Sequence, residues 1–276
     1  MLGAIVGDIV GSQFEHTRHT SKDFPLFSPG CRFTDDTVLT AAVCEALLAC
    51  GKDLSQLPQA ASRLLAHYAD LYWQASYGAK FNLWRLSDDH APYFSCGNGA
   101  AMRVSGCAYA AETIEEVFAL ADAVTAVTHN HPEGIKGARA VAACIFLARR
   151  GSTKDKIKAY VEEHFYDLSF TLDEIRPTYS RMLGLNTCQK SVPQALQCFF
   201  ESVSFEDALR NAVSLGGDSD TLAAMAASVA DAYYGIPEEI ADQAAGFLDE
   251  RLASVLGAFE TRFRASDSQQ VSFFLT

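Results

Sequence analysis

The stretch Gly216-Gly217-Asp218-Ser219-Asp220-Thr221 leads directly into Leu222-Ala223-Ala224-Met225-Ala226-Ala227 and an apolar run that ends at Tyr234. The run contains no glycine or proline, so it predicts a helix over residues 221–234. Its many alanines allow the axes of neighbouring helices to approach closely. We therefore expect a compact helical core with two acids at the start of one central helix.

A second acidic cluster, Thr34-Asp35-Asp36-Thr37, opens a similar apolar helix over residues 38–50, which Gly51 ends. One interpretation is that each cluster only caps its helix, since Asp and Thr are preferred N-cap residues. Capping does not need the second acid, however, and clustered carboxylates repel one another unless a proton or a cation neutralises them. Such oxygen ligands suit Mg²⁺, Mn²⁺ or Ca²⁺ better than zinc. The two clusters predict two helix N-termini that meet around divalent metal, with enough ligands for two ions.

Helical periodicity recurs along the chain and strand-like alternation is almost absent, which predicts an all-α protein. We expect one compact orthogonal helical bundle over residues 1–265 and a C-terminal tail at 266–276, because no linker-like segment divides the sequence. The further helices that the pattern predicts span residues 57–73, 113–127, 132–150, 153–165, 192–202, 205–215 and 238–264.

Composition narrows the possible partners and compartment. The 276 residues carry a formal net charge of −12, which argues against broad binding of nucleic acid or of an anionic membrane. The apolar N-terminus lacks the basic region of a signal peptide, and no apolar run is long enough for a membrane span. The eight cysteines include no CxxC pair, which favours buried free thiols. We expect a cytoplasmic monomer.

Three further segments contain candidate site residues. Gly3, Gly7 and Gly11 recur every four residues, typical of a closely packed helix that carries Asp8 towards a buried site with Glu15 beyond it. Residues 97–103, Gly-Asn-Gly-Ala-Ala-Met-Arg, form either a turn or a backbone cradle for a ligand. Arg103 either makes an internal ion pair or faces an anion. In Thr128-His129-Asn130-His131, we expect a ligand contact for His129 and a structural role for His131.

Five motifs occur in order along nearly the whole chain: Gly3-x3-Gly7-Asp8-x2-Gly11-x3-Glu15, Phe33-Thr34-Asp35-Asp36-Thr37, Gly97-Asn98-Gly99-x2-Met102-Arg103, Thr128-His129 and Gly216-Gly217-Asp218-Ser219-Asp220-Thr221. Together they resemble the ADP-ribosylglycohydrolase family. The resemblance implies an all-helical fold with a binuclear Mg²⁺ or Mn²⁺ centre at the bottom of a cleft. One departure is Val104, which follows Arg103 where family members often have proline, so the loop after this motif is expected to differ.

The resemblance also assigns roles to residues. It implies a metal-ligand set of Thr34, Asp35, Asp36, Asp218, Asp220 and Thr221. It implies a substrate-binding set of Gly97, Asn98, Gly99, Ala100, Met102, His129 and Ser219. Glu15 matches a glutamate on a mobile loop that senses or gates the metals. The candidate catalytic residues are Asp36 or Asp218 for the proton of the attacking water and Glu15 for the leaving group.

The predicted reaction is hydrolysis of the N- or O-glycosidic bond between ADP-ribose and an acceptor, which releases ADP-ribose. The acceptor is an arginine or serine side chain or a small molecule, and we expect the loops at residues 71–93 and 167–190 to contact it. One alternative is a non-catalytic ADP-ribose-binding protein of the same fold, although such a protein is expected to have lost acids that are all present here. Another is a metal-dependent hydrolase of a different nucleotide or glycoside.

Overall fold

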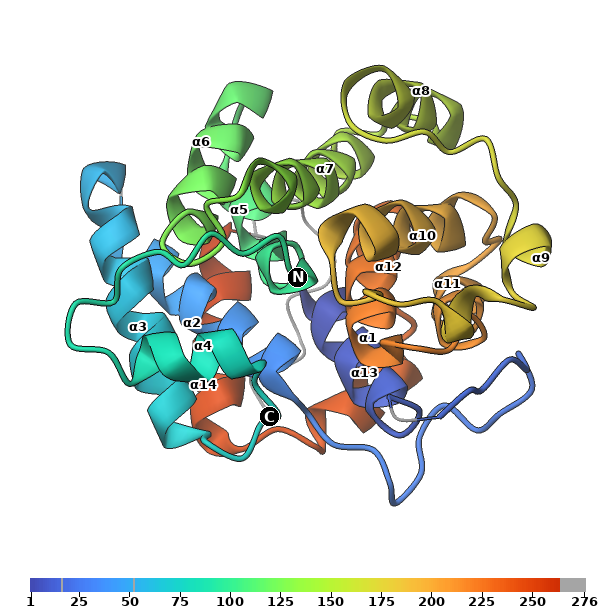
Figure 1. Cartoon of the computed structure of the whole chain (residues 1–276), viewed down its shortest axis with the longest axis horizontal. Coiled ribbons are helices and arrows are strands. Elements are labelled where there is room, and N and C mark those ends of the chain that lie inside the picture. The colour runs from blue at the N-terminus through green and yellow to red at the C-terminus, as the bar shows by residue number, and fades with distance from the viewer. Residues whose placement is uncertain (16, 52, 264–276) are drawn as a thin grey trace.

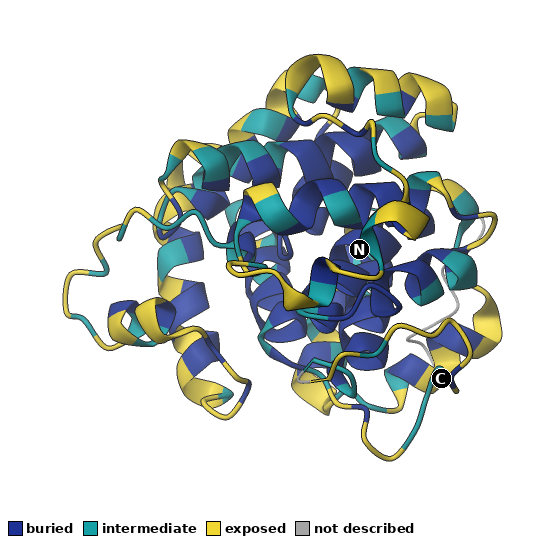
Figure 2. Ribbon diagram, turned by 45° about the vertical axis from the view of Figure 1, so that its right-hand side comes forward, coloured by how far each residue is buried: buried dark blue, intermediate teal, exposed yellow. Residues whose placement is uncertain are grey.

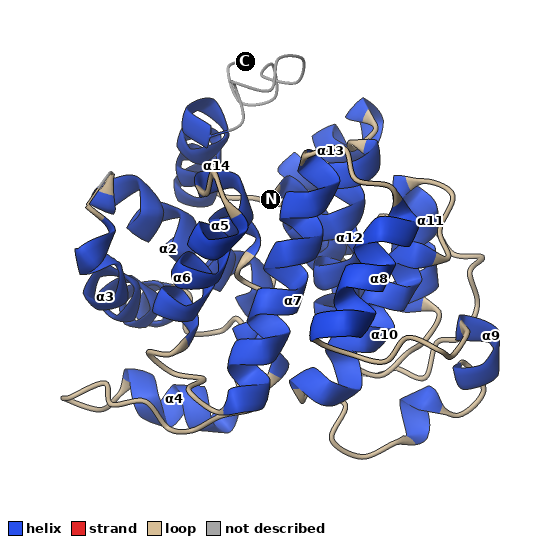
Figure 3. Ribbon diagram, turned by 90° about the horizontal axis from the view of Figure 1, so that it is seen from above, coloured by secondary structure: helices blue, strands red, loops and turns tan. Residues whose placement is uncertain are grey.

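The computed structural model describes residues 1–15, 17–51 and 53–263. Within them it contains α-helices, short 3-10 helices and loops but no strand, apart from one isolated antiparallel bridge between Gly97 and Thr187 (Figure 3). The predicted all-α class and the compact single bundle are therefore confirmed. The predicted tail at 266–276 lies outside the described residues.

The α-helices in the described part of the chain follow one another with short connections. They are α1 (Leu2–Ser12), α2 (Asp35–Cys50), α3 (Leu57–Leu71), α4 (Ala79–Arg85), α5 (Ser105–Ala110), α6 (Ile114–Thr125), α7 (Pro132–Arg149), α8 (Lys154–His164), α9 (Leu172–Ile175), α10 (Cys188–Phe200), α11 (Phe205–Val213), α12 (Ser219–Tyr234), α13 (Glu238–Ala245) and α14 (Glu250–Phe263). The 3-10 helices are η1 (Leu54–Gln56), η2 (Asn98–Ala100) and η3 (Tyr179–Arg181).

The closest helix contact of the core joins α1 to α12. A Cβ added at Gly3 or Gly7 would lie 2.2 Å from a backbone oxygen of α12, and one at Gly11 would lie 2.5 Å from Cα of Asp220. Gly3 faces Ala227 and Asp231, whereas Gly11 faces the start of α12, so the two helices run antiparallel. The predicted close packing of the glycine face is confirmed, and it brings the C-terminal half of α1 against the N-terminus of α12.

Most of the helices lie in two groups, one on each side of α7. Helices α2, α3, α5, α6 and α14 lie on one side of α7, and α10, α11, α12 and α13 lie on the other (Figures 1 and 3). Nearly every residue of α12 up to Asp231 is buried, and exposed residues gather on the outer helices (Figure 2). The core is continuous between the two groups. The N-terminus of α2 is therefore held close to the α1–α12 contact.

Two predicted helix boundaries were wrong. The helix expected from residue 192 begins at Cys188, with Pro193 inside α10, although proline favours a first turn. The single helix expected over 238–264 is interrupted after Ala245. There, Asp249 accepts a hydrogen bond from the backbone amide of Leu252 at 2.9 Å and so starts α14 as a new helix.

The eight cysteines are free and six of them are buried, as the sequence predicted. Burial raises the pKa of the Cys107 thiol to about 12. Such thiols are unreactive at neutral pH and serve as small apolar side chains. None of the helices in the described ranges has the length and apolar character needed to cross a membrane.

Candidate metal centre and substrate cleft

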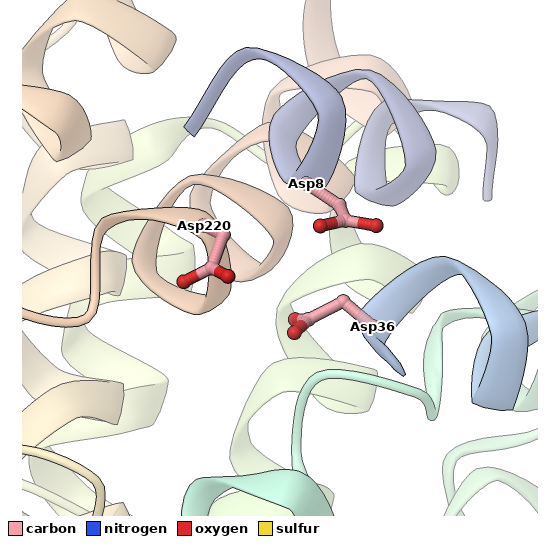
Figure 4. A group of neighbouring side chains, drawn as sticks. All are labelled: Asp8, Asp36 and Asp220. Carbon is pink, nitrogen blue, oxygen red and sulfur yellow. The ribbon is translucent and has the colours of Figure 1, made fainter. Parts of the chain in front are cut away.

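Three helices each contribute a buried carboxylate to one point of the core. Asp8 projects from the middle of α1, Asp36 from the first turn of α2 and Asp220 from the first turn of α12 (Figure 4). One carboxylate oxygen from each lies within 4.8 Å of the others. The two acidic clusters, which are far apart in sequence, therefore meet as predicted, and Asp8 joins them.

Asp8 attaches α1 to the N-terminus of α2. Its carboxylate accepts hydrogen bonds from the backbone amide and hydroxyl of Thr34, at 2.8 Å and 2.6 Å, and from the amide and hydroxyl of Thr37. Burial raises the pKa of Asp8 above its usual value, although these four hydrogen bonds act in the opposite direction. A helix N-terminus is also a favourable place for a negative charge. Asp8 is thus well bonded even though it is completely buried.

Asp36 and Asp220 are much less well compensated. Asp36 Oδ2 accepts a hydrogen bond from Thr221 Oγ1 at 3.1 Å, but Asp36 Oδ1 is buried and has no hydrogen-bond partner among the described residues. Burial, followed by the charges of the neighbouring aspartates, raises the pKa of Asp36 well above its ordinary value. The same causes, with Asp218 the first of the charges, raise the pKa of Asp220. The folded chain therefore concentrates negative charge that its own groups do not neutralise.

A divalent cation fits this arrangement on chemical grounds. The polar atoms gathered here are carboxylate and hydroxyl oxygens, which are the ligands that Mg²⁺ and Mn²⁺ prefer. The unpartnered oxygen of Asp36 is available to a cation, and a cation would relieve the repulsion that raises the carboxyl pKa values. The acidic cluster is thus a group of residues that can bind metal.

Asp35 and Asp218 extend the acidic site towards solvent. Both are half-buried and line a cleft of ≈ 450 Å³ beside the cluster, and Glu15 lines it as well. Burial and the charges of Asp8, Asp218 and Glu15 raise the pKa of Asp35 well above its usual value. Asp218 Oδ2 accepts a hydrogen bond from Asn98 Nδ2 at 2.6 Å. Glu15 Oε2 lies 3.6 Å from Arg32 Nη2.

Two consecutive glycines place Asp218 at this position. Gly216 and Gly217 have φ angles of 69° and 79°, a conformation that L side chains rarely adopt. A Cβ at Gly217 would also lie 2.7 Å from Leu185. The pair reverses the chain after α11, so α12 begins at the acidic site.

The predicted site residues divide into those that line the cleft and those that lie behind it. The ones on the cleft wall are Glu15, Asp35, Gly97, Asn98, Gly99, Met102, His129, Asp218, Asp220 and Thr221. Thr34, which is hydrogen-bonded to Asp8, lies behind the wall. Asp36 and Ala100 are buried and lie behind it as well. Ser219 Oγ donates to the backbone oxygen of Gly11 at 3.1 Å and so attaches α12 to α1. The ligand and substrate roles of these residues stay predictions.

The glycine-containing loop at residues 97–99 and His129 lie side by side on the cleft wall. A Cβ at Gly97 or Gly99 would lie 3.3 Å from His129 Nε2, so neither position has room for a larger residue without movement of the ring. The volume of the cleft is in the range usual for small-molecule sites. His131 instead caps α7, since its Nδ1 accepts a hydrogen bond from the amide of Glu133 at 3.0 Å. The structural role expected for His131 is confirmed.

Sequence reasoning left two features unassigned. Asp8 was singled out but omitted from the ligand set, although its position between two packing glycines was a usable signal. The sequence left open whether Arg103 makes an internal ion pair or faces an anion, and in the structure its side chain is buried beside the cleft, with Nη2 donating to Thr128 Oγ1 at 2.6 Å. No local pattern could have identified that partner, which lies on a different element.

Comparison with known proteins places this all-helical bundle, with its acidic cluster beside a cleft, in a known family. A family model described as ADP-ribosylglycohydrolase matches residues 1–268. The chain is 28% identical to ADP-ribosylhydrolase ARH3 of Mus musculus, covering 90% of this chain and 86% of that protein. It is 28% identical to ADP-ribosyl-[dinitrogen reductase] glycohydrolase of Rhodospirillum rubrum, covering 86% and 85% respectively.

A solved structure, described as an ADP-ribosylglycohydrolase-related protein complex, has the same fold. It superposes with a TM-score of 0.68 at 23% sequence identity and covers 96% of this chain and 97% of its own. The chain belongs to the ADP-ribosylglycohydrolase family, and it is a hydrolase.

Proposed function

We propose that this protein hydrolyses the glycosidic bond between ADP-ribose and an acceptor, with two divalent ions, Mg²⁺ or Mn²⁺, at the acidic site. The observation that carries the proposal is the buried, uncompensated charge of Asp36 and Asp220 at the base of a cleft. The names of the relatives support ADP-ribosyl transfer to water as the reaction class. The residues that would hold the ions are Asp8 or Thr34, Asp35, Asp36, Asp218, Asp220 and Thr221.

The reaction replaces the bond from the anomeric carbon to the acceptor nitrogen or oxygen with a bond to water oxygen, and a proton passes to the acceptor. Divalent ions bound here would supply Lewis acidity and lower the pKa of water. The surrounding carboxylates favour positive charge that develops on the sugar during bond cleavage. Asp218 lines the cleft and can accept the proton of the attacking water, and Asp36 is the alternative base.

The leaving group would receive its proton from Glu15. This residue lines both the main cleft and an adjoining cavity of ≈ 390 Å³, so it lies at the boundary between them. Asp218 and Asn186 also line both cavities. We propose that ADP-ribose occupies the main cleft and that the acceptor occupies the adjoining cavity. Of the two segments proposed to contact the acceptor, residues 167–190 line both cavities, whereas residues 71–93 line the main cleft.

The acceptor is proposed to be an arginine or serine side chain, or a small molecule. The other expected properties continue as proposals on separate grounds. The net charge of −12 supports an absence of nucleic-acid binding, and the free cysteines support a reducing, cytoplasmic location. We also propose that the protein acts as a monomer.

The test measures ADP-ribose released from arginine-ADP-ribosylated and serine-ADP-ribosylated substrates, with Mg²⁺, with Mn²⁺ and with EDTA. The wild type is compared with an Asp35→Ala, Asp36→Ala double variant. Glu238→Ala, Glu239→Ala is a matched control, because it removes an adjacent pair of acids in the first turn of another helix, α13, where both are exposed and outside the cleft. We expect release that requires both metal and Asp35–Asp36, and the substrate that is cleaved identifies the linkage.

Binding of ADP-ribose without any release would instead favour the non-catalytic binding protein. Release from other nucleotides or glycosides alone would favour a hydrolase of a different substrate, which a substrate screen detects. Release that continues undiminished in EDTA, or in the Asp35–Asp36 variant, would contradict the proposed metal centre.

A further inference from the structure

Arg103 is a fully buried cation that forms part of the cleft lining. Its Nη2 donates to Thr128 Oγ1 at 2.6 Å and to the backbone oxygen of Val124 at 3.3 Å. Its Nε and Nη1 have no hydrogen-bond partner among the described residues. Burial lowers the pKa of Arg103 to about 10, so the guanidinium stays charged at neutral pH. Burying a charge with so few partners is costly, which suggests a role beyond packing.

The hydroxyl of Thr128 connects Arg103 to His129. Thr128 Oγ1 accepts from Arg103 and has one proton of its own, with His129 Nδ1 at 2.7 Å and the backbone oxygen of Thr125 at 3.4 Å as the two possible acceptors. The longer distance exceeds the normal range for an O–H···O hydrogen bond. The oxygen of Thr125 also already accepts from the backbone amides of Thr128, at 3.1 Å, and His129, at 2.8 Å.

The hydroxyl proton of Thr128 therefore points to His129 Nδ1. A nitrogen that accepts a hydrogen bond carries no proton, so a neutral imidazole must have its proton on Nε2. His129 is held neutral, because burial and then the charge of Arg103 lower the pKa of its ring well below the usual value. The geometry thus selects one of the two tautomers.

The protonated nitrogen faces the cleft. His129 Nε2 lies beside Gly97 and Gly99, and all three residues line the same cavity. The ring also packs edge-on against Tyr93, with 5.6 Å between ring centroids, which restricts its rotation. The missing side chains at the two glycines leave the Nε2–H free to meet a ligand atom rather than a methyl group.

We propose that Arg103 and Thr128 are positioning residues that fix His129 as the Nε2–H tautomer, so that this N–H donates to an oxygen of the ADP-ribosyl group in the cleft. The inference rests on the proposed function for the identity of the ligand. The tautomer itself is a property of the ligand-free protein, so the two can fail separately.

The test is a long-range ¹H–¹⁵N correlation spectrum of the histidine rings in ligand-free protein at neutral pH, with His129 assigned from a His129→Gln variant. We expect an unprotonated Nδ1 and a protonated Nε2 in the wild type. Thr128→Ser retains the hydroxyl and should preserve this pattern, whereas Thr128→Val should lose it. Thr125→Val is a matched control on the preceding turn, since Thr125 Oγ1 has no hydrogen-bond partner in the described structure.

Calorimetry with ADP-ribose gives the second readout. Thr128→Val should bind ADP-ribose about tenfold more weakly than the wild type, because one well-placed hydrogen bond is lost. Thr128→Ser and Thr125→Val should bind ADP-ribose like the wild type. A proton on Nδ1 in the wild type, or an unchanged tautomer in Thr128→Val, would overturn the inference. The expected tautomer without detectable ADP-ribose binding would overturn the assigned ligand. Binding without hydrolysis would overturn only the proposed reaction and leave this inference supported.

Discussion

The two ends of the contact between α1 and α12 both contain buried carboxylates, but only one end supplies them with a countercharge. At the first end, Asp231 is 1% exposed and its Oδ2 accepts hydrogen bonds from the Met1 ammonium and the amide of Gly3, each at 3.0 Å. At the other end, Asp36 and Asp220 repel each other and Asp36 Oδ1 has no hydrogen-bond partner among the described residues. One end of the α1–α12 contact therefore holds a neutralised acid, and the other end, together with α2, holds an uncompensated acidic group.

This contrast separates two uses of a buried charge. The carboxylate of Asp231 and the ammonium of Met1 compensate each other, so the pair holds the helices together without any ligand. At the other end, helix N-termini and hydroxyls surround the acids, but the charged neighbours that act most on Asp36 and Asp220 are all carboxylates. Their free energy is unfavourable unless a proton or a metal ion joins them. The pair of Met1 and Asp231 thus helps to hold α1 and α12 in the arrangement that brings the acids together at the other end.

The largest effect is expected at the uncompensated end. Asp36→Asn keeps the shape of the side chain but removes one charge, and we expect ADP-ribose release to fall by about 10³-fold. The free energy of unfolding in EDTA should nevertheless increase, because repulsion from Asp8 and Asp220 is relieved. Initial rates and urea unfolding measure the two effects. A variant that loses activity and stability together would contradict the contrast.

At the neutralised end, we expect the change in the free energy of unfolding to have the opposite sign. Asp231→Asn removes the carboxylate charge that pairs with the buried Met1 ammonium, which should lower the free energy of unfolding by about 3–5 kcal/mol. Activity per folded molecule should change little, because Asp231 lies at the far end of the α1–α12 contact from the acidic cluster. Urea unfolding and the specific activity of the folded fraction provide the measurement. A stability within about 1 kcal/mol of the wild type would show that the pair contributes little.

Gly7 tests the connection between the two ends. In Gly7→Ala, the new Cβ would lie 2.2 Å from the backbone oxygen of Ala223, so α1 and α12 must move apart. We expect a loss of about 3 kcal/mol of stability and a lower activity, since Asp8 and Asp220 would separate. Gly30→Ala is the control, because its Cβ would make only ordinary contacts, at 3.5 Å or more. Equal stability of the two variants would disprove the close-packing explanation.

The smallest effect is expected from pH in metal-free protein. The folded pKa values of Asp36 and Asp220 are raised above 3.8, so the folded state binds protons at a pH where the unfolded chain does not. Their destabilising contribution is therefore present at neutral pH and is relieved as pH falls through the folded pKa values. In EDTA, wild-type stability should rise relative to that of Asp36→Asn on acidification from neutral pH. Parallel pH profiles would contradict the repulsion.

The sequence predicted the acidic end of this contrast, because the relevant signals are local, but it did not predict the pair of Met1 and Asp231. The helix starts, the paired acids and the glycine spacing of α1 all follow from short patterns. What it missed depends on contacts between distant segments. The membership of Asp8 in the cluster and the bond from Arg103 to Thr128 exist only once the helices pack. Two helix starts were missed for another reason, because the apolar pattern alone does not mark them. Helix α10 begins before Pro193, and Asp249 starts α14 as a separate helix.

Calorimetric titration of the metal-free protein with Mn²⁺ tests the central claim that the uncompensated end is a metal centre. The comparison needs the wild type, Asp36→Asn and Asp231→Asn. We predict two bound ions for the wild type and for the folded Asp231→Asn protein, and the loss of at least one ion in Asp36→Asn. Absence of saturable binding by the wild type, or equal binding by Asp36→Asn, would contradict the claim.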